Sequence, residues 1–292
     1  MITNKNTFLL IAILATFTSG CASKEDYKKF AEAGKTFANA NNTLLNTASD
    51  VTINTTSERA LSDRMSQGLK PSNEVTQKFV ERYRKYSTGD KERLELIQEL
   101  RKHNQFLILY FDKLIDLASS DSPARTQKSV DNIALQLQNS GTKLINFGKI
   151  GKLPSVTKIV LDARIRGAIR VELEKRKETI YREITIQEEL LKVLSKSMED
   201  DVKVMRELKE FRLVLNPLIQ PGDIAGDEWI QTRNKVMTQD TQPILTINQA
   251  SASLGEFKQM FIASVEGEVT SKRLKKFIQE TNSFSELVLN NQ

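Results

Sequence analysis

Residues 171–216 read VELEKRKETIYREITIQEELLKVLSKSMEDDVKVMRELKEFRLVLN, and no proline occurs between Pro154 and Pro217. Apolar side chains recur along this stretch at steps of three, four and seven residues, which is typical of a helix packed along a coiled-coil-like seam. The seam comprises Ile180, Ile184, Leu191, Leu194, Met198, Val202, Met205 and Leu208. At 1.5 Å per residue, the stretch predicts one helix about 70 Å long. Gly167 marks a bend expected just before it.

The rest of the chain has the same helical character. Only 12 Gly and 6 Pro occur among 292 residues, which is few for an all-β protein that needs frequent turns. We expect the first helix to begin at Ser23 and to fray or break within residues 39–57, which are rich in Asn and Thr. Further helices are expected over residues 72–86, 90–118, 123 onward, 227–239, 244–266 and 270–290.

Several local signals set these boundaries. The run Ser87-Thr88-Gly89 predicts the end of the short second helix, and Asp90 is the expected cap of the next one. The segment Phe106–Phe111 is apolar on all sides, as in a helix buried among neighbours. Asp121-Ser122-Pro123 is typical of a helix start, with a capping side chain and a proline in the first turn.

Small residues recur every seven positions on the helix that follows. They are Ala134, Gly141 and Gly148, and they predict close approach to another helix. Together these patterns predict an all-α fold: an elongated multi-helix bundle, without a firm internal boundary, over residues 21–292.

The N-terminus carries the most specific signal. Residues 1–21 read MITNKNTFLLIAILATFTSGC, with one basic residue, a ten-residue apolar core from Phe8 to Phe17, and small or polar residues before Cys21. This is the layout of a secretory signal peptide. Ten apolar residues are too few to span a hydrocarbon layer of about 30 Å, so residues 1–20 are expected to be removed rather than retained as an anchor.

The Gly20-Cys21 ending resembles the lipobox of bacterial lipoprotein signals. The resemblance covers residues 1–22 and implies acylation of the Cys21 thiol, cleavage before Cys21 and acylation of the new amine. Two or more acyl chains hold a protein firmly on a bilayer. Ala22, where some relatives carry Asp, implies transfer to the outer membrane, facing the periplasm. The alternatives are ordinary cleavage with a free secreted product, or a buried structural cysteine.

Composition and residue counts exclude several classes of site. Cys21 is the only cysteine, so a disulfide-stapled domain is excluded. His103 is the only histidine, so a multi-histidine metal site within one chain is excluded, and His103 itself is expected to have a packing or surface role. Ala33-Gly34-Lys35-Thr36 lacks the first glycine of a phosphate-binding loop. The acids Asp223, Asp227 and Glu228 fit no calcium loop, and Asp227 is expected to cap a helix.

The formal net charge is +6, and two basic clusters contribute to it. One lies between Lys158 and Arg182, and the other is Lys272-Arg273-Leu274-Lys275-Lys276. We interpret both as solvated helix faces, with anionic lipid headgroups as the alternative partner. They lack the interleaved aromatic residues typical of nucleic-acid binding, so no nucleic-acid partner is expected.

The sequence therefore predicts a lipid-anchored cell-envelope protein without catalytic site, metal or cofactor. Its expected role is that of a helical interaction or structural component that binds an envelope protein, a glycan or anionic lipid. The alternative is a ligand-binding lipoprotein that holds an apolar molecule between helices beneath Phe106–Phe111. An enzyme that uses only carboxylates and hydroxyls is the third hypothesis.

Overall fold

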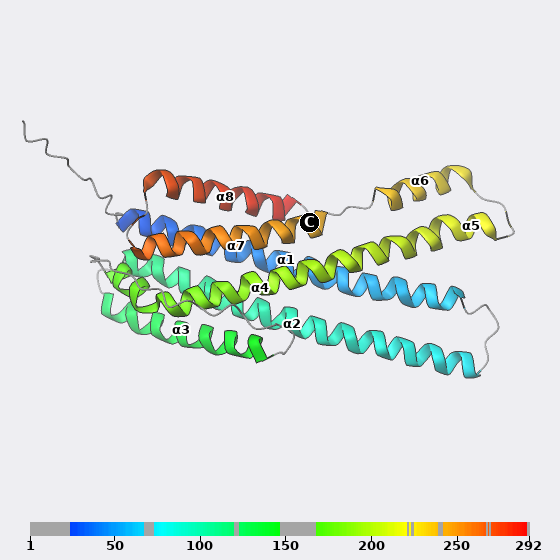
Figure 1. Ribbon diagram of the computed structural model, residues 1–292, viewed down its shortest axis with the longest axis horizontal. Coiled ribbons are helices and arrows are strands. Elements are labelled where there is room, and N and C mark those ends of the chain that lie inside the picture. The colour runs from blue at the N-terminus through cyan, green and yellow to red at the C-terminus, as the bar shows by residue number, and fades with distance from the viewer. Residues whose placement is uncertain are drawn as a thin grey trace, which may run out of the picture.

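The computed structural model describes residues 24–66, 73–119, 123–146, 168–220, 222, 225–238, 242–266, 268 and 270–290. Over these ranges the protein is an all-α bundle, elongated along one axis, with no strand (Figure 1). Its elements are α1 (Lys24–Ser66), α2 (Asn73–Ser119), α3 (Pro123–Asn146), α4 (Ala168–Glu210), η1 (Phe211–Leu215), α5 (Asn216–Ile219), α6 (Gly226–Met237), α7 (Gln242–Glu266) and α8 (Ser271–Asn290). The predicted fold class is confirmed.

The long helix predicted from the seam is α4. Ile180, Leu191 and Met198 are fully buried, whereas Lys196 on the opposite side is exposed. The helix continues from α4 through the π-turn η1 into α5. In η1 the Asn216 amide donates to the Phe211 carbonyl. Pro217 lacks an amide hydrogen and its ring crowds the preceding turn. A one-residue widening of the helix just before Pro217 therefore lets the chain remain helical.

The predicted break in the first helix is wrong. Helix α1 runs without interruption through residues 39–57, and hydroxyl side chains in this stretch find their hydrogen-bond acceptors among carbonyls of the same helix. Thr52 Oγ1 donates to the Ala48 carbonyl at 2.9 Å, and Thr55 Oγ1 donates to the Val51 carbonyl at 2.8 Å. Both threonines are buried, so packing against neighbouring helices outweighs their weak helix propensity.

The predicted boundary at Ser87-Thr88-Gly89 is also wrong, because α2 passes through it as one helix. Thr88 Oγ1 donates to the Arg84 carbonyl at 2.9 Å, within the helix. Asp90 caps no helix, since its carboxylate accepts a hydrogen bond from Thr56 of α1 at 2.8 Å. A glycine inside a helix costs about 1 kcal/mol, and cross-helix contacts of this kind offset that cost.

At the other end of the chain, Asp227 is not the predicted helix cap. The cap position of α6 is Ala225, whose carbonyl accepts from the Trp229 amide at 2.9 Å, and Asp227 lies in the first turn. A carboxylate there still interacts favourably with the helix dipole. Helix α7 agrees with the prediction within two residues and α8 within one.

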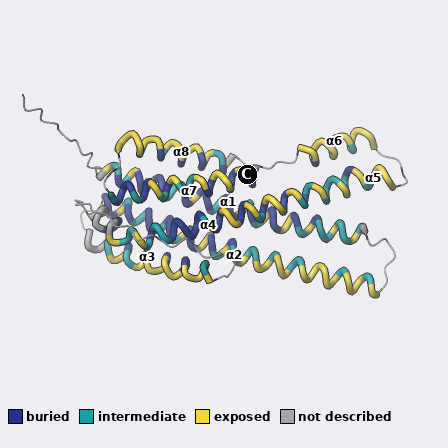
Figure 2. The backbone as a smooth tube through the Cα atoms, in the orientation of Figure 1, coloured by how far each residue is buried: buried dark blue, intermediate teal, exposed yellow. Residues whose placement is uncertain are grey.

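The core occupies one half of the rod, and Figure 2 shows the buried residues gathered there. We call this the proximal half, because it contains the start of α1. Its centre is a cluster of aromatic rings whose centroids lie 5.1 to 6.4 Å apart, contributed by Phe30, Phe37, Phe111, Phe257, Phe261, Phe277 and Phe284. Phe111 thus packs against rings of α1 and α7, as expected for the apolar segment 106–111.

The other half, which we call the distal half, has almost no core. It consists of residues 59–66 of α1, residues 73–96 of α2, residues 206–219 of α4, η1 and α5, and helix α6. Only Val214 and Val236 are buried among the residues whose burial is described in these ranges. The distal half therefore gains little stability from apolar burial, which is about 25 cal/mol per Å².

Two glycines let neighbouring helices approach closely. A Cβ atom on Gly34 of α1 would lie 2.9 Å from the Phe111 ring. A Cβ atom on Gly141 of α3 would overlap with the Glu183 carboxylate of α4. The predicted close approach is confirmed at Gly141, whereas Gly148 lies outside the described residues.

A buried carboxylate joins α4 to α7. Glu188 is 8% exposed and forms ion pairs with Lys192, at 2.8 Å, and with Lys258 of α7. Burial raises the pKa of the Glu188 carboxyl, but hydrogen bonds from the two lysines outweigh burial, so its pKa lies below the ordinary value. A lowered folded-state pKa means that ionised Glu188 stabilises the fold above the ordinary glutamate pKa of about 4.3.

That contribution is lost as the pH falls from about 4.3 through the folded-state pKa. We therefore expect Glu188→Gln to lower the melting temperature at neutral pH, and the difference from wild type to shrink as the solution is acidified. Thermal melts over a pH series measure this difference. The exposed Glu199→Gln variant is the control and should track wild type throughout. A difference for Glu188→Gln that stays constant with pH would contradict the assignment.

Candidate functional site

A cleft of about 750 Å³ opens where the two halves of the rod meet. Helix α3 covers the groove between α2 and α4 as far as its last turns, where Lys143 pairs with Glu99 of α2 at 2.5 Å. On the other side, Arg182 of α4 donates to Thr142 at 3.2 Å. Helix α3 then ends at Asn146, and the cleft lies beyond that end.

The lining of the cleft is apolar where α2 and α4 face each other. Leu96 and Leu100 come from α2, and Leu190, Val193 and Leu194 come from α4. Leu194 belongs to the seam predicted from the sequence, and it is buried. Val193 is 46% exposed, so it presents apolar surface to the solvent in the cleft. The cleft is therefore a continuation of the α2–α4 groove that α3 leaves uncovered.

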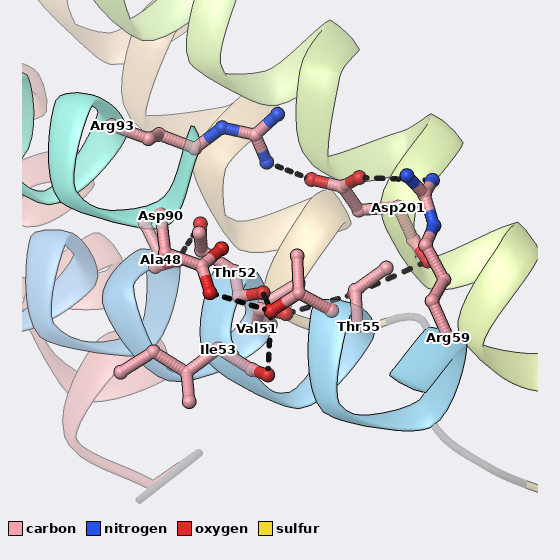
Figure 3. A network of polar contacts seen from close by, with 10 residues as sticks. Ala48, Val51, Thr52, Ile53, Thr55, Arg59, Asp90, Arg93 and Asp201 are labelled. Carbon is pink, nitrogen blue, oxygen red and sulfur yellow. Dashed lines mark hydrogen bonds and ion pairs between the residues drawn. The ribbon is translucent and has the colours of Figure 1, made fainter. Parts of the chain in front are cut away.

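A buried carboxylate holds the polar wall of the cleft together (Figure 3). Asp201 of α4, whose side chain is 9% exposed, pairs with Arg93 of α2 and with Arg59 of α1. The Arg59 Nη2 atom lies 3.8 Å from Asp201 Oδ1. Thr55 of α1 also donates to the Asp201 carbonyl at 3.4 Å. One residue of α4 thus binds both neighbouring helices at the mouth of the cleft.

Two further bonds between α1 and α2 close this wall. Thr56 Oγ1 donates to Asp90 Oδ2 at 2.8 Å, and the Tyr86 hydroxyl donates to Asp63 Oδ2 at 2.9 Å. Burial, followed by the hydrogen bond to Asp63, raises the pKa of Tyr86, so the phenol stays protonated at neutral pH. Asp201 and Asp90 of the wall thus have partners on neighbouring helices. An apolar floor below a charged rim is the lining expected of a site for a molecule that is largely apolar.

A second polar group lies inside the bundle, beside the end of α3. His103 of α2 is fully buried, and its Nε2 lies 2.9 Å from Glu183 Oε2 while its Nδ1 lies 2.6 Å from Gln187 Nε2. Glu183 and Gln187 are also fully buried. The packing role expected for His103 agrees with this position, because none of the three side chains contacts solvent.

A third polar group crosses α2, α3 and α4 nearer the start of α4. Glu172 accepts hydrogen bonds from Gln127 of α3 and from Arg176, and the bond from Arg176 measures 3.2 Å. Burial raises the pKa of the Glu172 carboxyl in spite of these bonds. Burial also raises the pKa of Tyr110 far above its usual value, and the Glu172 charge adds to this. These groups hold helices together within the bundle.

The remaining residues that the sequence singled out are dispersed. Cys21 and the leader lie outside the described residues, as do Asp223 and the part of the first basic cluster up to Gly167. Asp227 and Glu228 are exposed in the first turn of α6, and residues 33–36 lie inside α1. Lys175 and Arg176 pair with Asp131 of α3. Within the described ranges, no group of three or more acidic, histidine or cysteine side chains is placed to bind a metal ion.

Sequence reasoning missed the cleft and its central carboxylate. Asp201 is seven residues after Leu194 and three after Met198, which places an acid on the seam. Glu183 and Gln187 flank the seam residue Ile184 in the same way. Polar residues at seam positions could have indicated these buried contacts from the sequence, because a seam residue is buried and a buried polar group needs a partner.

Among the helices that the structure describes, none combines the length and the apolar character needed to cross a bilayer. Comparison with known protein families, curated proteins and solved structures finds no match for this chain.

Proposed function

We propose that this protein is a lipid-anchored rod of the bacterial cell envelope that uses its distal half to bind a helix of a partner protein. The observation that carries the proposal is the distal half itself, where long helices project side by side with almost no buried residue. Apolar side chains exposed on such helices are typical of a surface that a partner covers.

The spacing of these side chains favours a helical partner. Four apolar side chains here are 42 to 68% exposed, and they follow one another at steps of four, three and one residues: Phe211, Leu215, Leu218 and Ile219. This is the pattern of a helix face that packs against another helix. We call these four residues the distal stripe. Trp229 of α6 donates to the Val214 carbonyl at 3.0 Å, so α6 packs on η1 at the buried Val214, whereas the four residues of the distal stripe remain exposed.

The direction of α1 relative to the proposed anchor supports the same arrangement. Helix α1 begins at Lys24, three residues after Cys21, at the proximal end, and runs toward the distal half (Figure 1). A helix of this length spans about 65 Å at 1.5 Å per residue. If Cys21 is acylated, the distal stripe stands at the end of the rod that is farther from the bilayer. A rod of this kind presents a binding surface to partners away from its own membrane.

A photo-crosslinking side chain at Leu218 tests the distal surface. Leu218 is 52% exposed, and Leu135 on α3, 56% exposed, is a matched control in the proximal half. We expect a discrete protein adduct from Leu218 in intact cells and none from Leu135. Adding Phe211→Ser and Leu215→Ser should abolish the adduct and change the free energy of unfolding by less than about 0.5 kcal/mol each, as is usual for surface positions.

Other outcomes would contradict the proposal. Equal adducts from Leu218 and Leu135 would indicate contact without a defined surface. An adduct of twice the mass of this chain would show that the partner is a second copy of the same protein rather than a different one. Loss of folding in the Phe211→Ser and Leu215→Ser variant would show that the stripe is part of the core.

The second candidate function is the binding of an apolar molecule, and the cleft beyond α3 favours it. Its volume lies within the range of small-molecule sites, about 300–1,000 Å³, and five aliphatic side chains line it. This site lies at Leu96 and Leu100 rather than beneath residues 106–111, where Phe111 packs against neighbouring rings. A bulky Val193→Trp variant should reduce binding of a fluorescent fatty acid without changing the distal adduct.

A further inference from the structure

Helices α1 and α8 both begin at the proximal end, and they run parallel and in register. Phe30 of α1 stacks on Phe277 of α8 at 6.1 Å between ring centroids, and Phe37 packs on Phe284 at 5.1 Å. In both pairs the residue numbers of the two partners differ by the same amount. Residues 272–276 of α8 therefore lie level with residues 25–29 of α1. Figure 1 shows the starts of the two helices at the same end of the rod.

This register brings two groups of cations together. Lys28 and Lys29 come from the second turn of α1, and Lys272, Arg273, Lys275 and Lys276 come from the first turns of α8. We call these six residues the basic end patch. The four cations of α8 are exposed, and they alternate with Leu274 and Phe277, which are buried.

Neighbouring acids neutralise part of the patch. Lys28 pairs with Glu32 at 3.8 Å, Lys29 with Glu25 at 4.0 Å, and Lys276 with Glu280 at 3.4 Å. These are long, exposed pairs within one helix, which contribute about 0.5 kcal/mol or less. Lys272 and Lys275 have no ion pair with any residue that the structure describes.

The position of the α8 cations is unfavourable for the isolated fold. The N-terminus of a helix carries a partial positive charge, which favours acids in the first turn and disfavours bases. Helix α8 has no acid in its first turn and instead begins Ser-Lys-Arg-Leu-Lys-Lys. The dipole and the cations therefore add to one positive potential, which Glu266 at the end of α7 offsets only in part, because it lies close enough to Arg273 for that charge to act on its carboxyl. An external anion would relieve the remaining positive potential.

We propose that the basic end patch binds anionic phospholipid headgroups and so fixes the proximal end of the rod against the membrane. The proposal rests on the lipid anchor proposed above. Two residues, Ala22 and Ser23, separate Cys21 from Lys24, and the three Cα–Cα steps between them span at most about 11 Å. Because the register places the α8 cations level with residues 25–29, acylation of Cys21 would hold the patch close to the lipid surface. Each Lys or Arg near an anionic surface contributes about 1 kcal/mol.

The test uses the chain from residue 21 onward with Cys21→Ser, which contains every described residue and carries no acyl group. Its binding to vesicles of phosphatidylcholine mixed with phosphatidylglycerol is compared with binding to phosphatidylcholine alone. We expect binding to the mixed vesicles only, and weaker binding at high salt. Replacing Lys272, Arg273, Lys275 and Lys276 by Gln should reduce the partition coefficient at least about tenfold.

A matched control carries the same charge change in the rest of the rod, away from the proximal end: Arg84→Gln, Lys91→Gln, Lys203→Gln and Lys235→Gln, all at exposed positions. The control should lose less than about twofold in vesicle binding. Circular dichroism melts verify that both variants are folded. Equal losses in the two variants, or equal binding to both kinds of vesicle, would overturn the proposal. Acylation of Cys21 is measured separately by mass spectrometry, so failure of the patch and failure of the anchor are distinguishable.

Discussion

Replacement of Gly141 by Ala is expected to destabilise the protein by about 4 kcal/mol, from roughly 1–3 kcal/mol of overpacking and a similar amount for a displaced buried carboxylate. The new methyl group would occupy the position of Glu183 Oε2, which lies 2.9 Å from His103 Nε2. Neither partner can move toward solvent, because Glu183 and His103 are fully buried. Chemical denaturation with a helical dichroism signal measures the loss.

A second glycine provides the control for this substitution. Gly89 also lies inside a long helix, but a Cβ atom there would meet nothing within 4 Å. Gly89→Ala should therefore stabilise the protein by about 0.5–1 kcal/mol, because alanine loses less backbone entropy in a helix. In a Glu183→Ala background, the cost of Gly141→Ala should shrink by about 1–3 kcal/mol. Similar effects for the two glycines would contradict the packing described for Gly141.

The periodic part of the fold was predictable because helical periodicity is a local property. The seam from Ile180 to Leu208 specified α4, and the small residue Gly141 correctly predicted a close approach. Local propensity failed where packing decided the outcome. The threonines of α1 and the run 87–89 of α2 remain helical within long packed helices, and the hydroxyls of Thr52, Thr55 and Thr88 bond to carbonyls of their own helix.

The cleft was not predictable for a different reason. It depends on where α3 ends relative to α2 and α4, and the partners of Asp201 come from residues more than a hundred positions away. Long-range pairings of this kind leave no periodic signal in a single sequence. The distal half was missed similarly, because its helices carry ordinary amphipathic patterns and only the absence of a packed neighbour distinguishes them.

The Cys21→Ser variant is expected to lose membrane attachment almost completely. A single myristoyl chain binds a bilayer only marginally, with an association constant on the order of 10⁴ M⁻¹, but two or more chains anchor a protein firmly. Without the thiol no diacylglyceryl group can be attached. Wild type should therefore sediment with membranes after a salt wash, whereas the Cys21→Ser chain that has lost residues 1–20 should be recovered in the soluble fraction.

The salt concentration of the wash distinguishes the contribution of the anchor to membrane binding from that of the basic end patch. The acyl chains resist salt, whereas headgroup contacts are screened over a Debye length of about 8 Å at physiological ionic strength and 3 Å at 1 M. A variant that keeps Cys21 but carries the four glutamine substitutions in α8 should remain in the membrane fraction at all salt concentrations. If Cys21→Ser stays as firmly bound as wild type after the wash, Cys21 is not the anchor.

Mass spectrometry of the N-terminal peptide tests the central claim most directly. Trypsin cleaves after Lys24, so a protein cut before Cys21 yields the peptide Cys21-Ala22-Ser23-Lys24. The lipid anchor predicts that this peptide is recovered with diacylglyceryl on the sulfur and, in full processing, an acyl chain on the amine. An unmodified peptide that begins at another residue, or a peptide that still spans residues 20 and 21, would contradict it.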